Sequence, residues 1–198
     1  MKKIINQKVG AISLVFSSVA ILLSPVVASA ATANTTVSVD VGSTLSLSST
    51  GAVSFSITPT SGGVESSGSD TVTVSTNDTA GYTLKLADSD ATTTLASGSD
   101  TFTASSNTYA SPTTLATGEW GYAIPGGDFS GSYTTETNQA SSSLKWAGVP
   151  GSSSPQTIKT TATTATNDTT TVWYAAAADS SQPTGTYTDT VTYTATAN

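Results

Sequence analysis

The chain contains no cysteine and no histidine, and all six of its basic residues are lysines. Without cysteine the fold holds no disulfide, and no lipid can attach through a thiol. Nucleophile systems of the Ser-His-Asp and Cys-His kinds are excluded, together with the usual zinc ligands. The spacing of the carboxylates selects no pair for glycoside cleavage. The sequence therefore predicts a non-catalytic protein with no cofactor.

Positive charge is scarce along the rest of the chain. Residues 31–198 keep only Lys85, Lys145 and Lys159 against 13 acidic residues, a net charge of −10. A surface this acidic repels phosphate backbones, so nucleic acid is excluded as a partner. The same composition, rich in serine and threonine, is typical of soluble exported surfaces.

The first 30 residues have the pattern of a secretory signal peptide. Lysines at the start precede an apolar run from Val9 to Leu23, and Ala28-Ser-Ala30 forms a small-residue cleavage site. We expect cleavage after Ala30, with Ala33 as the alternative. The run is short and interrupted by serines, which disfavours an uncleaved anchor, and no second apolar span follows. The sequence predicts a secreted protein at the extracellular cell surface, with one domain over residues 31–198.

The most regular stretch lies near the C-terminus. It opens with Pro183 and Gly185, a turn signature, and every even position from Thr186 to Thr196 is threonine. The odd positions form an apolar-aromatic face: Tyr187, Asp189, Val191, Tyr193 and Ala195. Period-two alternation indicates a strand with one dry and one wet face, as in an antiparallel sheet that covers a core on one side.

Similar short runs recur along the chain with turn residues between them, and no helical period follows the signal. The sequence predicts an all-β fold, an antiparallel two-sheet sandwich of the immunoglobulin-like or Greek-key type with roughly eight to ten strands. We expect strands at Thr35–Val41, Leu45–Leu47, Val53–Ile57, Val72–Val74, Tyr82–Leu86, 101–104, 118–124, 142–146, 157–163, 170–178 and 186–196.

The middle of the domain, about residues 87–151, is rich in loops and carries scattered aromatic residues. They allow two interpretations, a buried core or an exposed surface that stacks on sugar rings. The candidates for such a ligand-binding surface are Trp120, Tyr122, Phe129, Tyr133 and Trp146.

A weak candidate for a calcium site lies at the start of this middle region. Asp88 and Asp90, with Asp100 beyond, offer alternating carboxylate oxygens of the kind that hard cations bind. The glycine and the distal glutamate of a helix-loop-helix calcium site are absent. The alternative interpretation is an acidic, solvated hairpin end.

The order of motifs resembles the WxL-type cell-surface domains of Gram-positive bacteria. The matching segments are Val53-Ser-Phe55, Gly81-Tyr-Thr-Leu84 and Gly185-Thr-Tyr-Thr-Asp-Thr-Val-Thr-Tyr-Thr194. Tyr82 and Tyr193 stand where that family has its hallmark tryptophans, and Ala195 replaces the second motif's leucine. The family-motif positions are thus Tyr82, Leu84 and Tyr193. The closing strand is also similar to spore-coat-U and pilin-like β-sandwiches, which typically carry a disulfide.

The WxL resemblance implies non-covalent binding to the cell wall, so one hypothesis is an exported binding module. Its partners would be cell-wall polysaccharide, peptidoglycan or other surface proteins. The alternative is a pilin-like or coat-like structural subunit that self-associates by strand exchange. In that hypothesis Thr35–Val41 fills the sheet edge of a neighbour.

Overall fold

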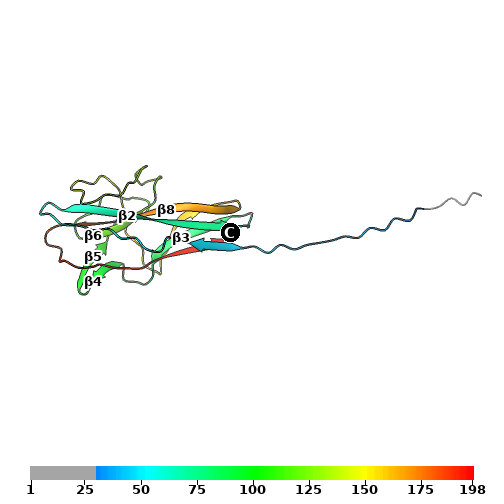
Figure 1. Ribbon diagram of the computed structural model, residues 1–198, viewed down its shortest axis with the longest axis horizontal. Helices are drawn as coiled ribbons and strands as arrows, with labels where there is room; N and C mark the ends of the chain where they lie inside the picture. Colours follow the sequence, from blue (N-terminus) through cyan, green and yellow to red (C-terminus); the bar gives the residue numbers. More distant parts are fainter. Residues whose placement is uncertain (1–29) are drawn as a thin grey trace, which may run out of the picture. The chain divides into compact units, whose positions relative to one another are not determined.

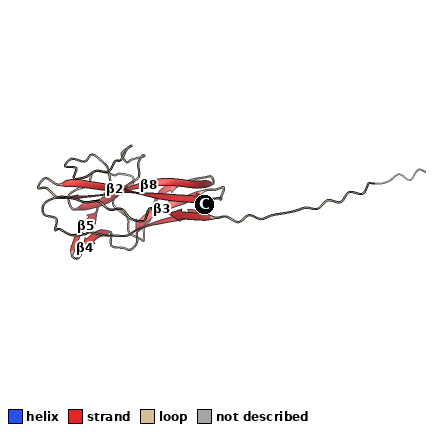
Figure 2. Cartoon of the chain, viewed as in Figure 1, coloured by secondary structure: helices blue, strands red, loops and turns tan. Residues whose placement is uncertain are grey.

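The computed structural model describes residues 30–198, so all but the last residue of the expected signal peptide lie outside it. The chain divides into an N-terminal unit, whose described part is residues 30–40, and a domain from Val41 to Asn198. Residues 30–40 are exposed and belong to no strand. The domain is built of strands and loops (Figure 2). Across residues 30–198, no helix is long and apolar enough to cross a membrane.

Within residues 30–198, nine strands form two sheets. Figure 1 shows how the labelled strands are arranged. The larger sheet has the order β1 (Leu45–Ser48), β2 (Val64–Thr76), β8 (Ala165–Ala178), β6 (Glu119–Ala123), β5 (Asp100–Ala104) and β4 (Thr94–Ser97). The smaller sheet has the order β7 (Gln156–Thr160), β3 (Tyr82–Asp88) and β9 (Val191–Ala197). The prediction of an all-β, two-sheet fold is confirmed. All strand pairs run antiparallel except β5 and β6, which run parallel.

The long pair β2–β8 forms the centre of the larger sheet. Its ladder extends from Val64 opposite Ala178 to Thr76 opposite Ala165. Alternate side chains on this pair, including Val72, Val74 and Val172, are fully buried, as are Leu84 and Leu86 of β3 in the smaller sheet. The apolar alternation read from the sequence therefore produces the core that lies between the two sheets.

The end of β8 is buried on both faces. Residues Ala175–Ala178 are all buried, so alternation disappears there, as expected for a strand covered on both sides. The segment that contains Ala147 lies very close to the neighbouring strand β6, because a Cβ on Gly121 would lie 2.5 Å from the Ala147 carbonyl oxygen. Tyr122 and Ala147 exchange two backbone hydrogen bonds at this edge. The part of the loop-rich middle around Ala147 thus pairs with β6 and covers the larger sheet.

Three of the expected strands do not form: Thr35–Val41, Val53–Ile57 and 142–146 have no strand ladder. The second of these segments lies against β2 instead, since a Cβ on Gly68 would be 3.0 Å from Val53 Cγ1.

The closing stretch is divided between the two sheets. Thr188 exchanges backbone hydrogen bonds with Ala96 of β4, and β9 begins only at Val191. Alternation cannot show this change of partner because both halves have the same period.

Candidate functional site

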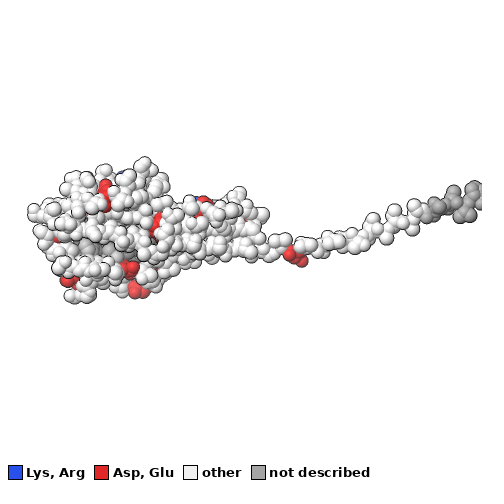
Figure 3. Space-filling model, viewed as in Figure 1, with Lys and Arg blue, Asp and Glu red and all other residues white. Residues whose placement is uncertain are grey.

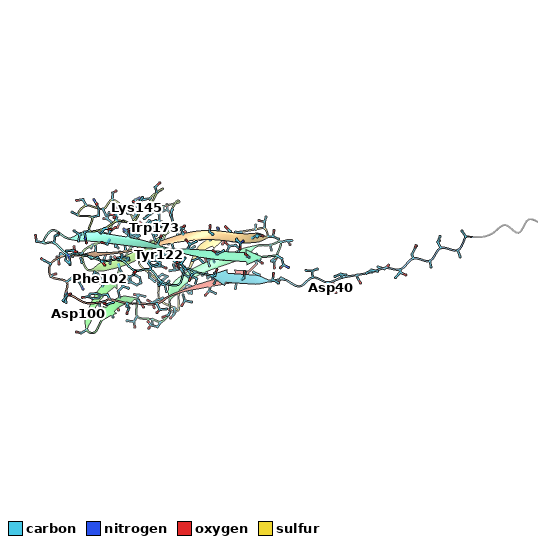
Figure 4. All side chains as sticks on the ribbon, viewed as in Figure 1. Asp40, Asp100, Phe102, Tyr122, Lys145 and Trp173 are labelled. Atoms are coloured by element: carbon cyan, nitrogen blue, oxygen red, sulfur yellow. The ribbon has the colours of Figure 1, made fainter. Side chains whose placement is uncertain are left out.

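The five aromatic side chains expected to form a ligand-binding surface are all buried. Trp146 is 0% and Tyr122 1% exposed, and the others are at most 8% exposed: Trp120, Phe129 and Tyr133. The exposed-surface interpretation is therefore corrected in favour of the core interpretation. Figure 4 labels Tyr122 and Phe102, and the side chains of both are buried. None of the five lies on the exposed surface of the domain.

These rings form two clusters on opposite faces of the larger sheet. Tyr122 lies opposite Tyr174 in the β6–β8 ladder, so their side chains share a face, and Tyr122 packs with Tyr109 and Phe129. Trp173 is the adjacent residue on β8 and projects to the other face. There Tyr133 stacks on Trp173 at 6.2 Å between ring centroids and meets Trp146 edge-on at 5.3 Å.

A pair of glutamates, of which one is buried and the other half-buried, lies beneath the second cluster. Glu65 is 4% exposed, and its Oε1 accepts a hydrogen bond from Trp146 Nε1 at 2.8 Å. Glu65 also exchanges two backbone hydrogen bonds with Gln139. Glu136 is the second member, and its Oε2 is buried without a hydrogen-bond partner. Burial, with the Glu136 charge adding to it, raises the pKa of Glu65 to about 7.

The three carboxylates considered for calcium do not come together. Asp88 is buried and accepts the backbone N–H of Asp90, whereas Asp90 is exposed and accepts that of Thr92. Asp100 lies on the β4–β5 hairpin (Figure 4). Over residues 30–198, no group of three or more acidic side chains is placed to hold a metal ion. The local carboxylate contacts are those of Asx turns.

Asp88 interacts instead with Asp189, which precedes β9. Burial raises the pKa of Asp189, and its contact with Asp88 raises it further. One oxygen of each carboxyl group, Oδ2 in both cases, is buried without a hydrogen-bond partner. The two side chains thus form a second acidic pair, at the point where β3 ends and β9 begins.

The family-motif positions have structural contacts. Tyr82 and Leu84 are fully buried on β3. The Tyr82 hydroxyl donates to Asp168 Oδ2 at 2.8 Å, and Asp168 pairs with Lys159 at 2.6 Å. Tyr193 is half-buried on β9, and its hydroxyl lies 2.7 Å from that of Tyr174. Tyr82 and Leu84 are therefore closed to a ligand, whereas Tyr193 borders a cavity.

This cavity, which we call the side cavity, opens between residues 49–55 and the start of β9. Its volume is about 280 Å³. It is lined by apolar side chains (Val53, Phe55, Leu95, Trp120 and Val191) and by polar ones (Asp70, Tyr174, Asp189 and Tyr193). Concave sites that combine apolar walls with a few polar groups are typical of small-molecule binding sites.

The polar wall of the side cavity is pre-arranged by hydrogen bonds. Asp70 Oδ1 accepts from the Thr50 backbone N–H at 2.9 Å and from the Thr50 hydroxyl. The Tyr174–Tyr193 hydroxyl pair joins the two sheets across the interior. Burial raises the pKa of both tyrosines, so both keep their protons and can donate and accept hydrogen bonds. The wall can bind hydroxyl groups but provides no activated nucleophile.

Sequence reasoning did not select Asp70, Tyr174 or Asp189 as cavity residues. One signal was present: Asp189 is the only charged residue on the otherwise apolar face of the closing stretch. Asp70 and Tyr174 gave no such signal, because their proximity depends on how the two sheets pack.

The N-terminal unit and the start of the domain carry the most exposed apolar side chains. Val37, Val39 and Val41 are 83%, 80% and 81% exposed. They occupy alternate positions, so in an extended chain all three point to one side. Charge is sparse in their surroundings, with Asp40 as the one acidic residue among positions 30–41.

The face of the domain drawn in Figure 3 carries no concentrated charge. On the face drawn in Figure 3, acidic side chains are scattered and basic ones are almost absent. The chain matches no protein-family model, no curated protein and no solved structure in comparisons with each. The resemblance to WxL-type and pilin-like domains therefore stays a prediction.

Proposed function

We propose that the chain is an exported structural subunit that assembles by adding its N-terminal segment, residues 35–41, to the sheet of a neighbouring copy. The observation that carries this proposal is the exposure of Val37, Val39 and Val41 on alternate positions. An apolar alternating segment is the pattern of a strand with one buried face. This segment has that pattern but has no strand partner among residues 30–198.

The energetics favour such an addition. Burying a valine side chain contributes roughly 1.5 kcal/mol or more, so three valines supply several kcal/mol before the ordering entropy of the segment is subtracted. Backbone hydrogen bonds to a sheet edge add specificity of register. Left uncovered, an apolar alternating segment tends to associate non-specifically. Binding to a defined site on another copy would cover these valines and prevent such non-specific association.

The test is sedimentation velocity of residues 31–198 over a range of concentrations. We expect concentration-dependent oligomers for the unmodified chain and a monomer for Val37→Asp/Val39→Asp, because a charge on the buried face of an added strand is costly. The matched control, Thr36→Asp/Ser38→Asp, adds the same charge to the opposite face and is expected to keep assembling. A strictly monomeric unmodified chain contradicts the proposal.

A second candidate function is binding of a wall or surface glycan in the side cavity. It is favoured by the carboxylates of Asp70 and Asp189 beside the rings of Trp120 and Tyr174, since carboxylates accept hydrogen bonds from sugar hydroxyls.

Co-sedimentation with purified peptidoglycan sacculi tests the glycan candidate. Asp70→Asn is expected to reduce the bound fraction, whereas Asp128→Asn, an exposed site outside the cavity, leaves it unchanged. Equal binding by both variants, or no binding by the unmodified chain, counts against this function.

A further inference from the structure

We infer that the outer edge of β1 is the acceptor for residues 35–41 of a second copy, and that the exchange is reciprocal, so that two chains form a two-fold dimer. This inference rests on the proposed assembly function and names the surface on which assembly takes place. The occupant is another molecule of this chain. One continuous stretch, residues 35–48, then supplies both the segment that is added and the edge that receives it.

The exposed apolar side chains are concentrated in this one stretch. Over residues 30–198, the large apolar side chains that are exposed all occupy odd positions between 37 and 47: Val37, Val39, Val41, Leu45 and Leu47. Odd positions of an extended chain share one face. The valine segment and β1 therefore carry a single apolar stripe, interrupted only by Ser43. Such a stripe is the pattern of a strand with one buried face.

The backbone of β1 has a paired side and an open side. β1 is the first strand in the order of the larger sheet and, within residues 30–198, pairs with β2 alone. Thr44 N–H donates to Asn77 Oδ1 at 2.7 Å, and the Thr44 carbonyl accepts from the Thr76 hydroxyl at 2.8 Å, so the even positions face β2. By alternation, Leu45 and Leu47 direct their N–H and C=O groups away from β2. Such groups are a template for another strand.

The two leucines keep exposed apolar surface even though β9 of the smaller sheet lies against β1. No ladder within residues 30–198 joins β1 to β9. Leu45 lies opposite Thr76 and Leu47 opposite Val74, and both of these partners are buried. Because directly opposed residues share a face, the leucines point toward the interior. Each nevertheless remains 38% exposed, and this is the surface that an added strand would bury.

Antiparallel pairing at this edge makes the exchange reciprocal. The valines share a face with Leu45 and Leu47 of the other copy only when odd positions lie opposite odd positions. Two registers achieve this and cover both leucines: the first places Val39 opposite Leu45, and the second places Val41 opposite Leu45. When residues 35–48 form one extended strand, either register produces the same contact twice, related by a two-fold axis near the middle of the stretch.

The other sheet edges offer less apolar surface. β4 is occupied at Ala96 by its two backbone hydrogen bonds with Thr188. β7 exposes Thr157 and Thr160, which are both polar. β9 is flanked by β1 and carries no exposed large apolar side chain. Within the described part of the chain, only β1 combines an unpaired edge with exposed apolar side chains.

Disulfide trapping between two separately prepared chains of residues 31–198 tests the assignment, and the lack of cysteine leaves no background. One chain carries Ser38→Cys. The other carries Ser46→Cys or Ser48→Cys, the exposed positions that lie opposite residue 38 in the first and the second register. Control acceptors carry Thr194→Cys on β9 or Thr157→Cys on β7, which are also exposed. Disulfides form only where Cα atoms approach within about 7 Å, so the linked position reports the register. A size tag on one chain identifies the hetero-dimer.

We expect linkage to one of the two β1 acceptors and none to the β9 and β7 controls. Oligomers in sedimentation without linkage to β1, or with equal linkage to a control, overturn the acceptor assignment and leave the assembly function standing. A strictly monomeric unmodified chain removes the assembly function, and the acceptor assignment with it.

The variant Leu45→Asp/Leu47→Asp tests the acceptor edge separately, because it places charge on the face that the valines would cover. Both leucines are partly exposed, so we expect the variant to keep its cooperative thermal unfolding. The dissociation constant of the dimer is expected to rise by a factor of about 100 or more. The matched control, Ser46→Asp/Ser48→Asp, adds the same charge to the outer face and is expected to dimerise as the unmodified chain does.

Sedimentation velocity also tests the reciprocal geometry. Two-fold exchange uses the donor segment and the acceptor edge of both chains, so we expect the unmodified chain to reach a dimer and no larger species. A series of larger oligomers contradicts the reciprocal exchange. Dimers that persist undiminished in a folded Leu45→Asp/Leu47→Asp chain contradict the β1 edge as the acceptor.

Discussion

Trp146→Ala is expected to lower the free energy of unfolding by about 4 kcal/mol, within the usual range for removing a buried tryptophan. Trp146 is fully buried and packs edge-on against Tyr133. Its indole N–H is also a hydrogen-bond donor to the buried carboxyl group of Glu65. The substitution therefore leaves a cavity and takes a partner from a buried polar group at the same time. A domain of this size has a total stability of about 5–15 kcal/mol, so this loss brings it close to unfolding.

Urea denaturation followed by far-ultraviolet circular dichroism measures this effect. Trp146→Phe keeps an aromatic ring in the core, although a smaller one, and removes the indole N–H, so it is expected to cost less than Trp146→Ala, about 1–3 kcal/mol. Trp173→Ala, at a half-buried position in the same cluster, is the second comparison. A Trp146→Ala chain as stable as the unmodified one would show that the ring is not part of the core. If Trp146→Ala lost glycan binding, the cause would be unfolding of the domain, because Trp146 is buried and cannot contact a glycan.

The strands that sequence alternation predicts correctly are those with one dry face. Tyr82, Leu84 and Leu86 alternate and form β3, and Val72 and Val74 form the inner face of β2. Alternation does not identify a partner, however. The valines of Thr35–Val41 have the same pattern as β3 and yet pair with no strand in the described part of the chain. A local pattern specifies a face, whereas a ladder requires a second strand from a distant part of the sequence.

The candidate site was harder to predict because its residues come from separate parts of the chain. Asp70, Tyr174 and Tyr193 meet only after β2, β8 and β9 have packed. The aromatic residues of the middle region stood among glycine, serine and threonine, a composition that suggests loops. The segment that carries Tyr133 and Trp146 nevertheless forms a layer over the outer face of the larger sheet, where the side chains are buried. Burial of this kind depends on tertiary packing and leaves no period in the sequence.

Because of the pair Glu65–Glu136, we expect the free energy of unfolding to fall as pH rises from about 4.5 to about 7. The pKa of Glu65 is raised from 4.5 to about 7 in the folded chain, chiefly by burial. Between these values the folded state keeps a proton that the unfolded state has released, so each rise in pH favours unfolding. The stabilisation is fully present below pH 4.5 and is lost once the folded group ionises. A rise of this size corresponds to about 3 kcal/mol, and the proton belongs to the pair as a unit.

Glu65→Gln isolates this contribution, because the amide oxygen can still accept the hydrogen bond from Trp146 but no longer titrates. We expect the variant to match the unmodified chain near pH 4.5 and to be more stable by up to about 3 kcal/mol at pH 8. Asp189 has a raised pKa in both chains and so cancels in the difference. Asp40→Asn, in the exposed N-terminal unit, is expected to leave the pH dependence unchanged. Parallel stability curves for Glu65→Gln and the unmodified chain from pH 4.5 to 8 would mean that Glu65 ionises in the folded domain as it does in the unfolded chain. The carboxyl pair would then have to be open to water, contrary to the burial of Glu65 beneath Trp146.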